Sequence, residues 1–517
     1  IRHVQALTAG VGRAAKINRI ILPAVLQWLG EGQNPDMGLL NWRKLEENFG
    51  TESGYLGFLR DSTSAAQRLC HILSNSRFLG DALNKSVESI SWLGDDDNLQ
   101  ARTREALDVQ TGSALERFGS NINEFATSMR AMRRHEIERI GLSLISDSDS
   151  LKAMTDVYDA IIDASLTWAV RHQIAEFGVE TAPAGITVIA MGRYGGREVN
   201  FSSDADAILI YRPADDADDG QANAFAKKVV EDLRNILQGP TTLEPKIELD
   251  LDLRPEGKNG PLVRSYASCE EYYESWASTW ERQALLRARY AAGDAELARD
   301  FLINIADPLR YPTTELTEAE LQNIRKLKAR MEAERLPRGV RRERHLKLGK
   351  GGLSDVEWTV QLMQLQHAGD IKDLRVNGTL EALDVLEAKK LISAIDAIQL
   401  RKAWTLCTAA RNGSYLWSGR ANQADILPDD IYSLGGIAVY LGYGAHRGQH
   451  FENDLLAVMR KCRDVCQRLF YGKTEGEAAA ATTATASAAT QQPQTAPRPR
   501  MHVIAPRLER NRRRAQR

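Results

Sequence analysis

The chain has 517 residues, 43% of them hydrophobic, and its 67 Lys and Arg nearly balance its 69 Asp and Glu, for a formal net charge of -2. The length is ample for several domains with cores of their own. The charge balance excludes a whole-molecule field that would draw the chain onto nucleic acid or a membrane surface. The 5 cysteines are scattered and lack a CxxC motif, which argues against a disulfide framework or a zinc site and favours a reducing, cytoplasmic compartment. No apolar run approaches the roughly 20 residues of a membrane span.

Helical periodicity dominates the N-terminal part of the chain. Apolar residues recur at spacings of three and four in residues 1–145, as at Ile21, Val25 and Leu29, and this pattern predicts an array of helices. Residues 150–180 predict one more amphipathic helix.

The period then changes to that of a sheet. Residues 186–191 form a compact β-branched run that predicts a buried strand, and residues 206–211 predict a second strand after a glycine-rich turn. A helix is predicted over 222–237. Residues 246–253 alternate apolar and polar side chains and predict a third strand with one polar face. That face carries Lys246, Glu248, Asp250 and Asp252.

Helical patterns return from about residue 268 to 470, with long periodic segments at 272–291 and 315–336. The predicted class is therefore α+β, predominantly helical, with a small mixed sheet flanked by helical bundles. The last stretch is rich in Ala and Thr, then in Pro, and ends in basic residues, a composition that predicts a disordered tail. The predicted division is a helical region at 1–145, the sheet domain at 146–305, a helical bundle at 306–475 and the tail at 476–517.

Two aspartates at the start of the second predicted strand are the strongest chemical signal. Asp204 and Asp206 are two residues apart, so on a strand their side chains point to one face. Carboxylates held together repel, and a divalent cation between them relieves the repulsion. A third carboxylate on a neighbouring strand completes a two-metal site, in which one ion activates the attacking oxygen and the other steadies the leaving group. Asp250, on the alternating strand, is placed for that role.

The glycine-rich turn supplies the second half of the constellation. Gly192, Gly195 and Gly196 permit close backbone approach, so amide N–H groups can surround a phosphate. Arg193 and Arg197 can pair with its oxygens. The turn is neither a Walker loop nor a dinucleotide fingerprint. Each feature alone fits a plain hairpin with capping aspartates, but the turn, the following serine pair, the aspartate pair and the later strand carboxylate together favour a phosphate and metal site.

Residues 192–206 resemble the signature of the DNA polymerase β-like nucleotidyltransferase superfamily, and they resemble the glutamine synthetase adenylyltransferase family more closely. Further stretches similar to that family lie at 34–40, 249–255, 260–263, 280–289 and 347–357. The resemblance covers about residues 1–475 and leaves out the tail.

This resemblance implies two similar nucleotidyltransferase domains in one long protein. The N-terminal one removes AMP from glutamine synthetase by phosphorolysis, and the C-terminal one attaches AMP from ATP. The present chain has one such domain after a linker-like stretch, an order that resembles the adenylylating half. The resemblance implies Mg²⁺ as the cofactor, ATP as a substrate, glutamine synthetase as the target, and a PII signalling protein and glutamine as effectors.

The residues that match the family's site are the metal-binding aspartates Asp204, Asp206 and Asp250 and the phosphate-contacting Gly192 and Ser203. There are departures from the family pattern. Arg193 stands where Lys is common, which keeps the charge and changes the geometry. Asp252 is an additional acid beside Asp250, so both are candidates for the third ligand, and Asp250 is favoured.

Several other residues have two interpretations each. Arg254 can reach a phosphate or pair with Glu256. Lys347 and Lys350, in a second glycine-rich segment, can face phosphate or the target protein. Asp355 and Glu357 follow that segment, and in the first turn of a helix they would be stabilised by its dipole without any part in the chemistry.

Three rival functions remain. The first uses the same site in the opposite direction and removes AMP with phosphate as the nucleophile. The second is a regulatory module with an inactive site, against which the three carboxylates argue. The third is a nucleotidyltransferase acting on RNA, which the net charge of -2 and the lack of a basic stripe oppose.

Overall fold

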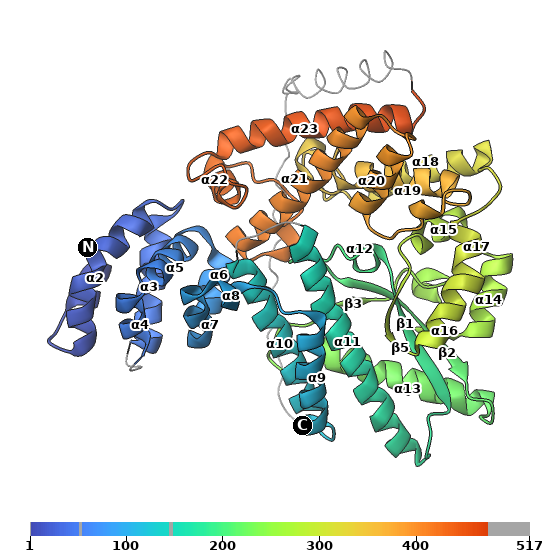
Figure 1. Cartoon of the computed structure of the whole chain (residues 1–517), viewed down its shortest axis with the longest axis horizontal. Coiled ribbons are helices and arrows are strands. Elements are labelled where there is room, and N and C mark those ends of the chain that lie inside the picture. Colours follow the sequence, from blue (N-terminus) through green and yellow to red (C-terminus); the bar gives the residue numbers. More distant parts are fainter. Residues whose placement is uncertain (1, 51–53, 144–147, 474–517) are drawn as a thin grey trace, which may run out of the picture.

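A small mixed sheet of five strands carries the predicted site, and helices form most of the surrounding chain (Figure 1). The computed structural model describes residues 2–50, 54–143 and 148–473. The predicted tail at 476–517 lies outside the described residues. The predicted class, α+β with a helical majority, is confirmed. In the described part of the chain, no helix combines the length and the apolar character needed to cross a membrane.

The central strands of the sheet are the two that the β-branched runs predict. β1 pairs antiparallel with β2 on one side and with β5 on the other, and β2 pairs in parallel with β3 and β4. The strands are β1 (Ala184–Ala190), β2 (Ala205–Pro213), β3 (Leu249–Asp250), β4 (Val263–Ser265) and β5 (Arg289–Gly293). Because both faces of β1 and β2 are covered by protein, these strands are apolar along almost their whole length.

Each face of the sheet packs on its own core. Val188 and Leu209 join the larger core with α10 (Ile122–Leu142), α11 (Ser148–Phe177) and α13 (Asp219–Gln238). Ile189 and Ile208, which point the other way, join a smaller core with the helices that follow β4. Those helices are α14 (Tyr266–Ser275), α15 (Thr279–Leu285), α16 (Ala295–Asp300) and α17 (Asp307–Arg310).

Two sequence predictions are wrong in extent. The strand predicted over 246–253 shrinks to the two residues of β3, because the Asp252 amide donates to Asp250 Oδ1 across 2.7 Å and turns the chain out of the sheet. The helix predicted over 272–291 is broken after α14, and residues 289–291 belong to β5, whose pairing with β1 overrides the helical pattern. The helices predicted over 150–180, 222–237 and 315–336 are confirmed as α11, α13 and α18.

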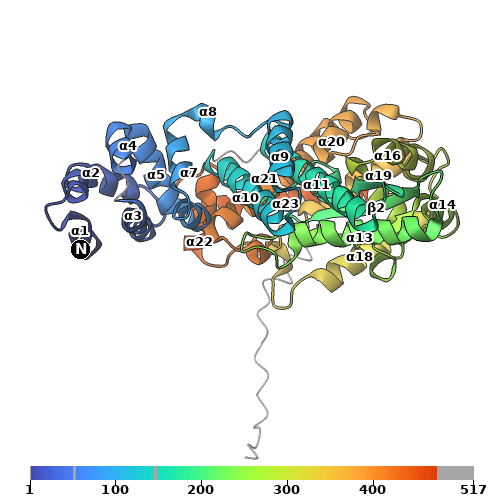
Figure 2. The same cartoon turned by 90° about the horizontal axis from the view of Figure 1, so that it is seen from below.

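The N-terminal helices form an arm at one end of an elongated molecule (Figure 2). They are α1 (Arg2–Thr8), α2 (Arg13–Gly30), α3 (Pro35–Phe49), α4 (Tyr55–Asp61), α5 (Thr63–Asn75), α6 (Arg77–Leu83), α7 (Val87–Ser91) and α8 (Asp96–Leu99). The next helix, α9 (Arg104–Phe118), lies outside the arm and packs on α10 and α11 (Figure 2). The arm is tied to the C-terminal helices, since Ser76 Oγ donates to the Leu416 carbonyl at 2.7 Å and Tyr440 donates to the Asn75 carbonyl at 3.1 Å.

The C-terminal helices form a bundle beside the sheet, on the side where α12 (Gly192–Gly195) lies (Figure 1). They are α18 (Glu318–Arg335), α19 (Leu353–His367), α20 (Thr379–Ala388), α21 (Ala394–Ser418), α22 (Ile431–Tyr440) and α23 (Gly448–Leu469). Asp355 lies in the first turn of α19, as predicted, but it is buried in an ion cluster, 2.5 Å from Lys328 Nζ and 2.9 Å from Arg463 Nη1. This cluster joins α18, α19 and α23.

Candidate functional site

The three predicted carboxylates meet at one edge of the sheet. The parallel register of β2 and β3 sets Asp206 beside Asp250, and Asp204 precedes Asp206 by two residues and faces the same way. One carboxylate oxygen from each of the three lies within 4.8 Å of those of the other two. We call these residues the acidic trio. Oxygen atoms at this spacing suit the ligand shell of a hard divalent cation.

The repulsion among the three carboxylates of the trio contributes to a raised pKa of Asp206. Burial, with the charges of Asp204 and Asp250, raises the pKa of Asp206 from 3.8 to about 7, although Lys347 and Arg193 oppose the rise. A group that is costly to ionise beside two other acids becomes stable as a carboxylate once a cation joins them. The donor set and its electrostatics therefore fit Mg²⁺.

The predicted glycine turn is a single helical turn, α12, that follows β1 directly. Gly192 begins it with a φ of +52°, and a Cβ at this position would lie 2.2 Å from Asp206 Oδ2. A side chain here would be strained and would also collide with the trio. Glycine therefore lets the backbone lie against the carboxylates.

The two later glycines of the turn serve a different contact. A Cβ at Gly195 would lie 1.9 Å from the Arg287 carbonyl oxygen, and one at Gly196 would lie 2.1 Å from Arg287 Nη1. Their amides already donate within the turn, from Gly195 to the Met191 carbonyl and from Gly196 to the Gly192 carbonyl. The structure places them against Arg287, and their predicted contact with phosphate stays a prediction.

Ser203 sits in a loop that Asn200 shapes. Ser203 Oγ donates to Asn200 Oδ1 at 2.9 Å and accepts from the Asn200 amide at 3.1 Å, and the Ser202 amide also donates to Asn200 Oδ1. Tyr158 donates to the Ser203 carbonyl at 3.2 Å. These bonds hold the serine pair at the mouth of β2, directly before the acidic trio.

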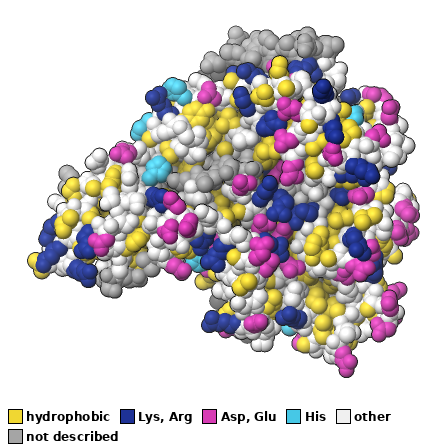
Figure 3. Space-filling view, viewed as in Figure 1, with side chains coloured by type: hydrophobic (Ala, Val, Ile, Leu, Met, Phe, Trp, Pro, Cys, Tyr) yellow, Lys and Arg dark blue, Asp and Glu magenta, His cyan; other side chains and the backbone are white. Residues whose placement is uncertain are grey.

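A cavity of about 340 Å³ lies between α12, the acidic trio and the C-terminal bundle. Gly192, Asp204 and Asp206 line its sheet side. The cations that line it are Arg193, Arg287, Lys347 and Arg411. We call it the cationic cavity. Figure 3 shows Lys and Arg side chains gathered beside Asp and Glu side chains near the centre of this face of the molecule.

Several nitrogen atoms of the cationic cavity are buried without a partner. Arg193 Nη2 donates to Glu357 at 2.6 Å, yet Arg193 Nε and Nη1 find no hydrogen-bond acceptor among the described residues. The same is true of Arg411 Nη1, although its Nε pairs with Asp425. A buried donor without a partner costs about 1–3 kcal/mol. An anionic ligand in the cavity would accept hydrogen bonds from these nitrogens and remove that cost.

Lys347 completes this set from the segment before α19. Burial, with the charges of Arg411 and Arg193, lowers the pKa of Lys347. The amide of Lys347 and that of Leu348 donate to His345 Nδ1, at 3.3 and 3.1 Å, which fixes the backbone that carries the lysine. Of the two lysines that the sequence brings forward, Lys347 lines the cavity and Lys350 does not.

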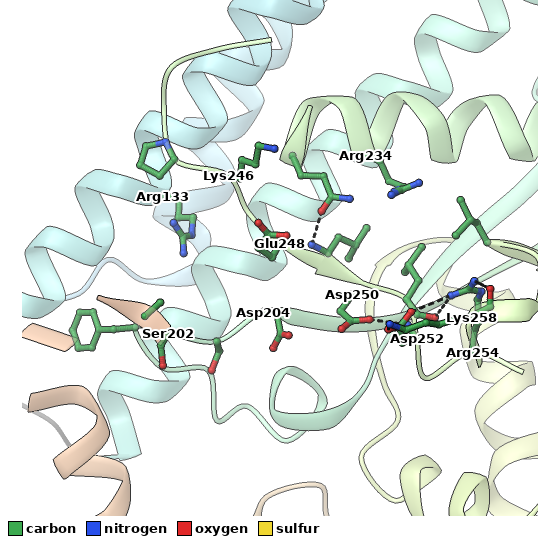
Figure 4. A pocket seen from close by; sticks show the side chains of 18 of the residues that line it. Arg133, Ser202, Asp204, Arg234, Lys246, Glu248, Asp250, Asp252, Arg254 and Lys258 are labelled. Carbon is green, nitrogen blue, oxygen red and sulfur yellow. Dashed lines mark hydrogen bonds and ion pairs between the residues drawn. The ribbon is translucent and has the colours of Figure 1, made fainter. Parts of the chain in front are cut away.

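A larger hollow of about 790 Å³ opens on the other side of the trio, and Asp204 and Asp250 point into it (Figure 4). It shares four lining residues with the cationic cavity: Ser202, Ser203, Asp204 and Ala421. The two spaces therefore adjoin at the trio.

Two arginines that are predicted to contact phosphate have structural partners, and their contact with phosphate stays a prediction. Arg254 is buried, and its guanidinium donates to the carbonyls of Leu251, Lys258 and Gly260 at 2.7–3.1 Å. It thereby holds the loop after β3. Its ion-pair partner is Asp252, at 3.8 Å from Nη1, whereas Glu256 pairs with Arg264. Arg197 donates to Asp156 at 2.5 Å.

Sequence reasoning missed the contribution of the C-terminal bundle. No motif in the sequence marks Arg411 or Asp425 as functional, and Arg287 lies in the stretch 280–289 that is similar to the family. The available signal is an arginine within the mainly apolar pattern of α21, where Arg411 is buried between Ala410 and Asn412. Buried arginines need partners, and this requirement marks them as candidates for function.

The glycine turn, the aspartate pair on a central strand and the third carboxylate on its parallel neighbour define a nucleotidyltransferase-like α+β protein. A family model described as glutamate-ammonia ligase adenylyltransferase matches residues 66–304, and one described as GlnD PII-uridylyltransferase matches residues 322–470. The chain belongs to the glutamine synthetase adenylyltransferase family.

Curated relatives named bifunctional glutamine synthetase adenylyltransferase/adenylyl-removing enzyme align with nine tenths or more of the chain. One from Bifidobacterium longum (strain DJO10A) is 99% identical over 100% of the chain and 48% of the relative. Another from Leifsonia xyli subsp. xyli is 42% identical over 92% of the chain and 46% of the relative. One from Mycobacterium avium is 39% identical over 91% of the chain and 48% of the relative. The chain thus spans about half the length of the relatives it matches.

Proposed function

We propose that this chain transfers AMP from ATP to a tyrosine hydroxyl of glutamine synthetase, with Mg²⁺ held by the acidic trio. The observation that carries the proposal is the junction of three carboxylates, within 4.8 Å of one another, with a cavity in which three buried guanidinium nitrogens, of Arg193 and Arg411, lack partners among the described residues. The printed name of the relatives supports glutamine synthetase as the target.

Divalent cations at the trio would neutralise charge on the nucleotide and polarise the phosphorus that reacts. The chain's own residues have three tasks around that chemistry. Arg193, Lys347 and Arg411 hold the negative charge of the phosphates in the cationic cavity. Gly192 lets the backbone lie against the trio. The Asp252 amide fixes the orientation of the Asp250 carboxylate through its 2.7 Å bond.

The reaction joins the tyrosine oxygen to the α-phosphorus and breaks the bond from that phosphorus to the oxygen bridging the α- and β-phosphates. The electron pair of the broken bond leaves with pyrophosphate. The phenolic proton, held with a pKa of about 10 in free tyrosine, passes to the Asp250 carboxylate. Charge that builds on the phosphate oxygens is met by donors already in place, which is the larger part of catalysis in such sites.

The same site would catalyse the removal of AMP if phosphate is the nucleophile and adenylylated tyrosine is the donor of AMP. ADP is then the product. The relatives' name includes an adenylyl-removing activity. We favour attachment, because a long helical region precedes the single sheet domain, the order expected of the adenylylating half. Incubation with adenylylated glutamine synthetase and phosphate, followed by assay for ADP, separates the two directions.

Regulators belong to the same proposal. We propose a PII signalling protein and glutamine as effectors from the family resemblance, and a family model whose description names PII matches residues 322–470. A cytoplasmic site of action is consistent with the cysteines, since all 5 are buried as free thiols.

The decisive experiment compares two neighbouring aspartates. Purified chain, glutamine synthetase, labelled ATP and Mg²⁺ are incubated, and label on glutamine synthetase is counted for wild type, Asp250→Asn and Asp252→Asn. Asp250 belongs to the trio, whereas the Asp252 side chain pairs with Lys258 at 3.2 Å outside it. We expect Asp250→Asn to lose about 100-fold or more of the rate and Asp252→Asn to keep most of it. Transfer by Asp250→Asn at the wild-type rate would refute the site.

A further inference from the structure

We propose that a groove leading to Asp250 receives an extended, acidic segment of the protein that carries the acceptor tyrosine. The inference rests on the proposed function and adds the entry side and the chemistry of the acceptor. The groove consists of the 790 Å³ hollow beside the trio and an adjoining hollow of about 740 Å³ along α13. The residues lining both are Arg234, Gln238, Lys246, Glu248 and Leu262, so the two hollows are continuous. We call the whole the acceptor groove.

The positions of the three trio residues indicate which side of the site holds the leaving group and which side admits the acceptor. Asp206 lines the cationic cavity and not the groove, Asp250 lines the groove and not the cavity, and Asp204 lines both. In-line displacement at phosphorus puts the entering oxygen and the leaving oxygen on opposite sides. Since the buried cations gather on the Asp206 side, the leaving pyrophosphate belongs there. The entering hydroxyl therefore comes from the groove.

Charge along the groove selects an acidic occupant. Lys227, Arg234 and Lys246 are exposed and form no ion pair with any carboxylate of the described residues. Figure 4 shows Arg133, Lys246 and Arg234 along one side of the hollow, opposite Asp204 and Asp250. Most of the acids outside the trio are already engaged, because Asp252 pairs with Lys258 at 3.2 Å and Glu231 with Lys228 at 2.9 Å.

One acid, Glu248, also lies in the groove without an ion pair among the described residues. The groove is lined by six Lys and Arg side chains and five Asp and Glu side chains, and two of those acids belong to the trio, so the groove keeps an excess of positive charge. A segment with several carboxylates and few cations is attracted overall, and the attraction acts on its rate of encounter as well as on its affinity.

Apolar side chains in its lining distinguish the acceptor groove from a surface that binds a nucleic-acid backbone. Leu262 lines both hollows with 38% of its surface exposed, and Pro245 and Pro261 stand beside the basic residues. Phe201 and Tyr415, stacked with ring centroids 5.8 Å apart, line the end nearest the serine loop. Apolar and aromatic walls between cations suit a polypeptide with mixed acidic and apolar side chains better than a uniform phosphate backbone.

The test is a charge-reversed double variant, Arg234→Glu with Lys246→Glu, beside the matched control Lys326→Glu. Lys326 is an exposed lysine of α18 that lines neither the groove nor the cationic cavity. We expect the KM for glutamine synthetase to rise about tenfold or more in the double variant, with a weaker dependence on salt. The KM for ATP and the binding of Mg-ATP to the chain are expected to stay within about twofold of wild type, as is every parameter of the control.

A peptide competition gives the second readout. A synthetic peptide with a tyrosine flanked by glutamates is expected to inhibit transfer by wild type, and the same peptide with lysines in place of glutamates is expected not to. The double variant should lose the inhibition. A short RNA that inhibits wild type, while the acidic peptide does not, would overturn a protein segment as the occupant.

The outcomes separate this inference from the proposed function. If wild type moves no AMP to glutamine synthetase in either direction, the proposed function fails and this inference fails with it. If wild type transfers AMP and the double variant keeps its KM for glutamine synthetase, the acceptor groove alone is overturned. If the double variant instead loses Mg-ATP binding, the groove holds the nucleotide and the assignment of sides is wrong.

Discussion

Arg193 donates to Glu357 across 2.6 Å, and this bond ties the one-turn helix beside the acidic trio to the first turns of α19 in the C-terminal bundle. Both side chains are almost fully enclosed. Although burial opposes it, the charge of Arg193 holds the pKa of Glu357 below its ordinary value. The pair therefore fixes the bundle against the site and also aims the remaining nitrogens of Arg193 into the cationic cavity.

The variant Glu357→Gln should destabilise the protein strongly. It leaves the Arg193 cation buried without its carboxylate, a change that costs about 3 kcal/mol in comparable buried pairs. Urea unfolding of the two proteins measures the difference. The control Glu296→Gln breaks an exposed pair with Arg299 at 3.5 Å and should change stability by about 0.5 kcal/mol or less. Equal effects from the two substitutions would show that the Arg193 pair has no special role.

Gly192→Ala should slow transfer by about 100-fold without unfolding the chain. The added Cβ would lie 2.2 Å from Asp206 Oδ2, so either the backbone or the carboxylate must move. Displacement of a reacting group by about 1 Å costs on the order of 100-fold in rate. The rate of AMP transfer and the midpoint of thermal unfolding are measured together.

The matched control for this variant is Gly112→Ala in the interior of α9. A Cβ there meets no atom within 4 Å. The substitution should therefore stabilise the helix by roughly 0.5–1 kcal/mol and leave transfer unchanged. A Gly192→Ala enzyme as active as this control would mean that the backbone does not need to lie against the trio.

The parts of the site that are local in sequence could be predicted, and the parts that tertiary packing brings together could not. The β-branched runs predict β1 and β2, and the spacing of Asp204 and Asp206 places them on one face. The meeting with Asp250 follows from the alternating pattern, although only two residues of that pattern form a ladder. The assignment of these residues as metal ligands stays a prediction, as does the division of the chain into domains.

The cationic cavity has no such local signature. Lys347 and Arg411 come from segments about a hundred residues or more downstream of the trio, and their position depends on how α19 and α21 pack on α12. The sequence pattern does not predict strand β5, for a related reason. Its residues 289–291 continue a helical pattern, and only pairing with β1 makes them a strand. Tertiary contacts override periodicity at both places.

Glu46 should make the N-terminal arm less stable as pH rises. Burial raises the pKa of Glu46 from 4.5 to about 7, although a hydrogen bond from Asn18 at 3.1 Å opposes the rise. Between these two values the folded state binds a proton that the unfolded state has released, so stability is lost as pH rises from about 4.5 to about 7. The shift corresponds to about 3 kcal/mol above pH 7.

Glu46→Gln should therefore stabilise the arm at pH 8 and have little effect at pH 4. Hydrogen exchange of the α3 amides at several pH values reports the local stability directly. Glu47→Gln is the control, because Glu47 is exposed and pairs with Arg43 at 2.6 Å. A wild-type arm with the same protection as Glu46→Gln at both pH values would contradict the raised pKa.

Lys347→Met should weaken ATP binding, and Lys350→Met should not. Lys347 lines the cationic cavity with Arg193 and Arg411, where burial and those two charges lower its pKa, whereas Lys350 does not line it. Removing one cation from a phosphate site should raise the KM for ATP by about tenfold, the equivalent of roughly 1.4 kcal/mol. The melting temperature without ligand should not fall, because the charge that is lost was desolvated and close to two other cations. The two variants carry the same substitution at almost the same place in the chain. An equal rise of the KM for ATP in both would therefore mean that the phosphates do not bind in the cationic cavity.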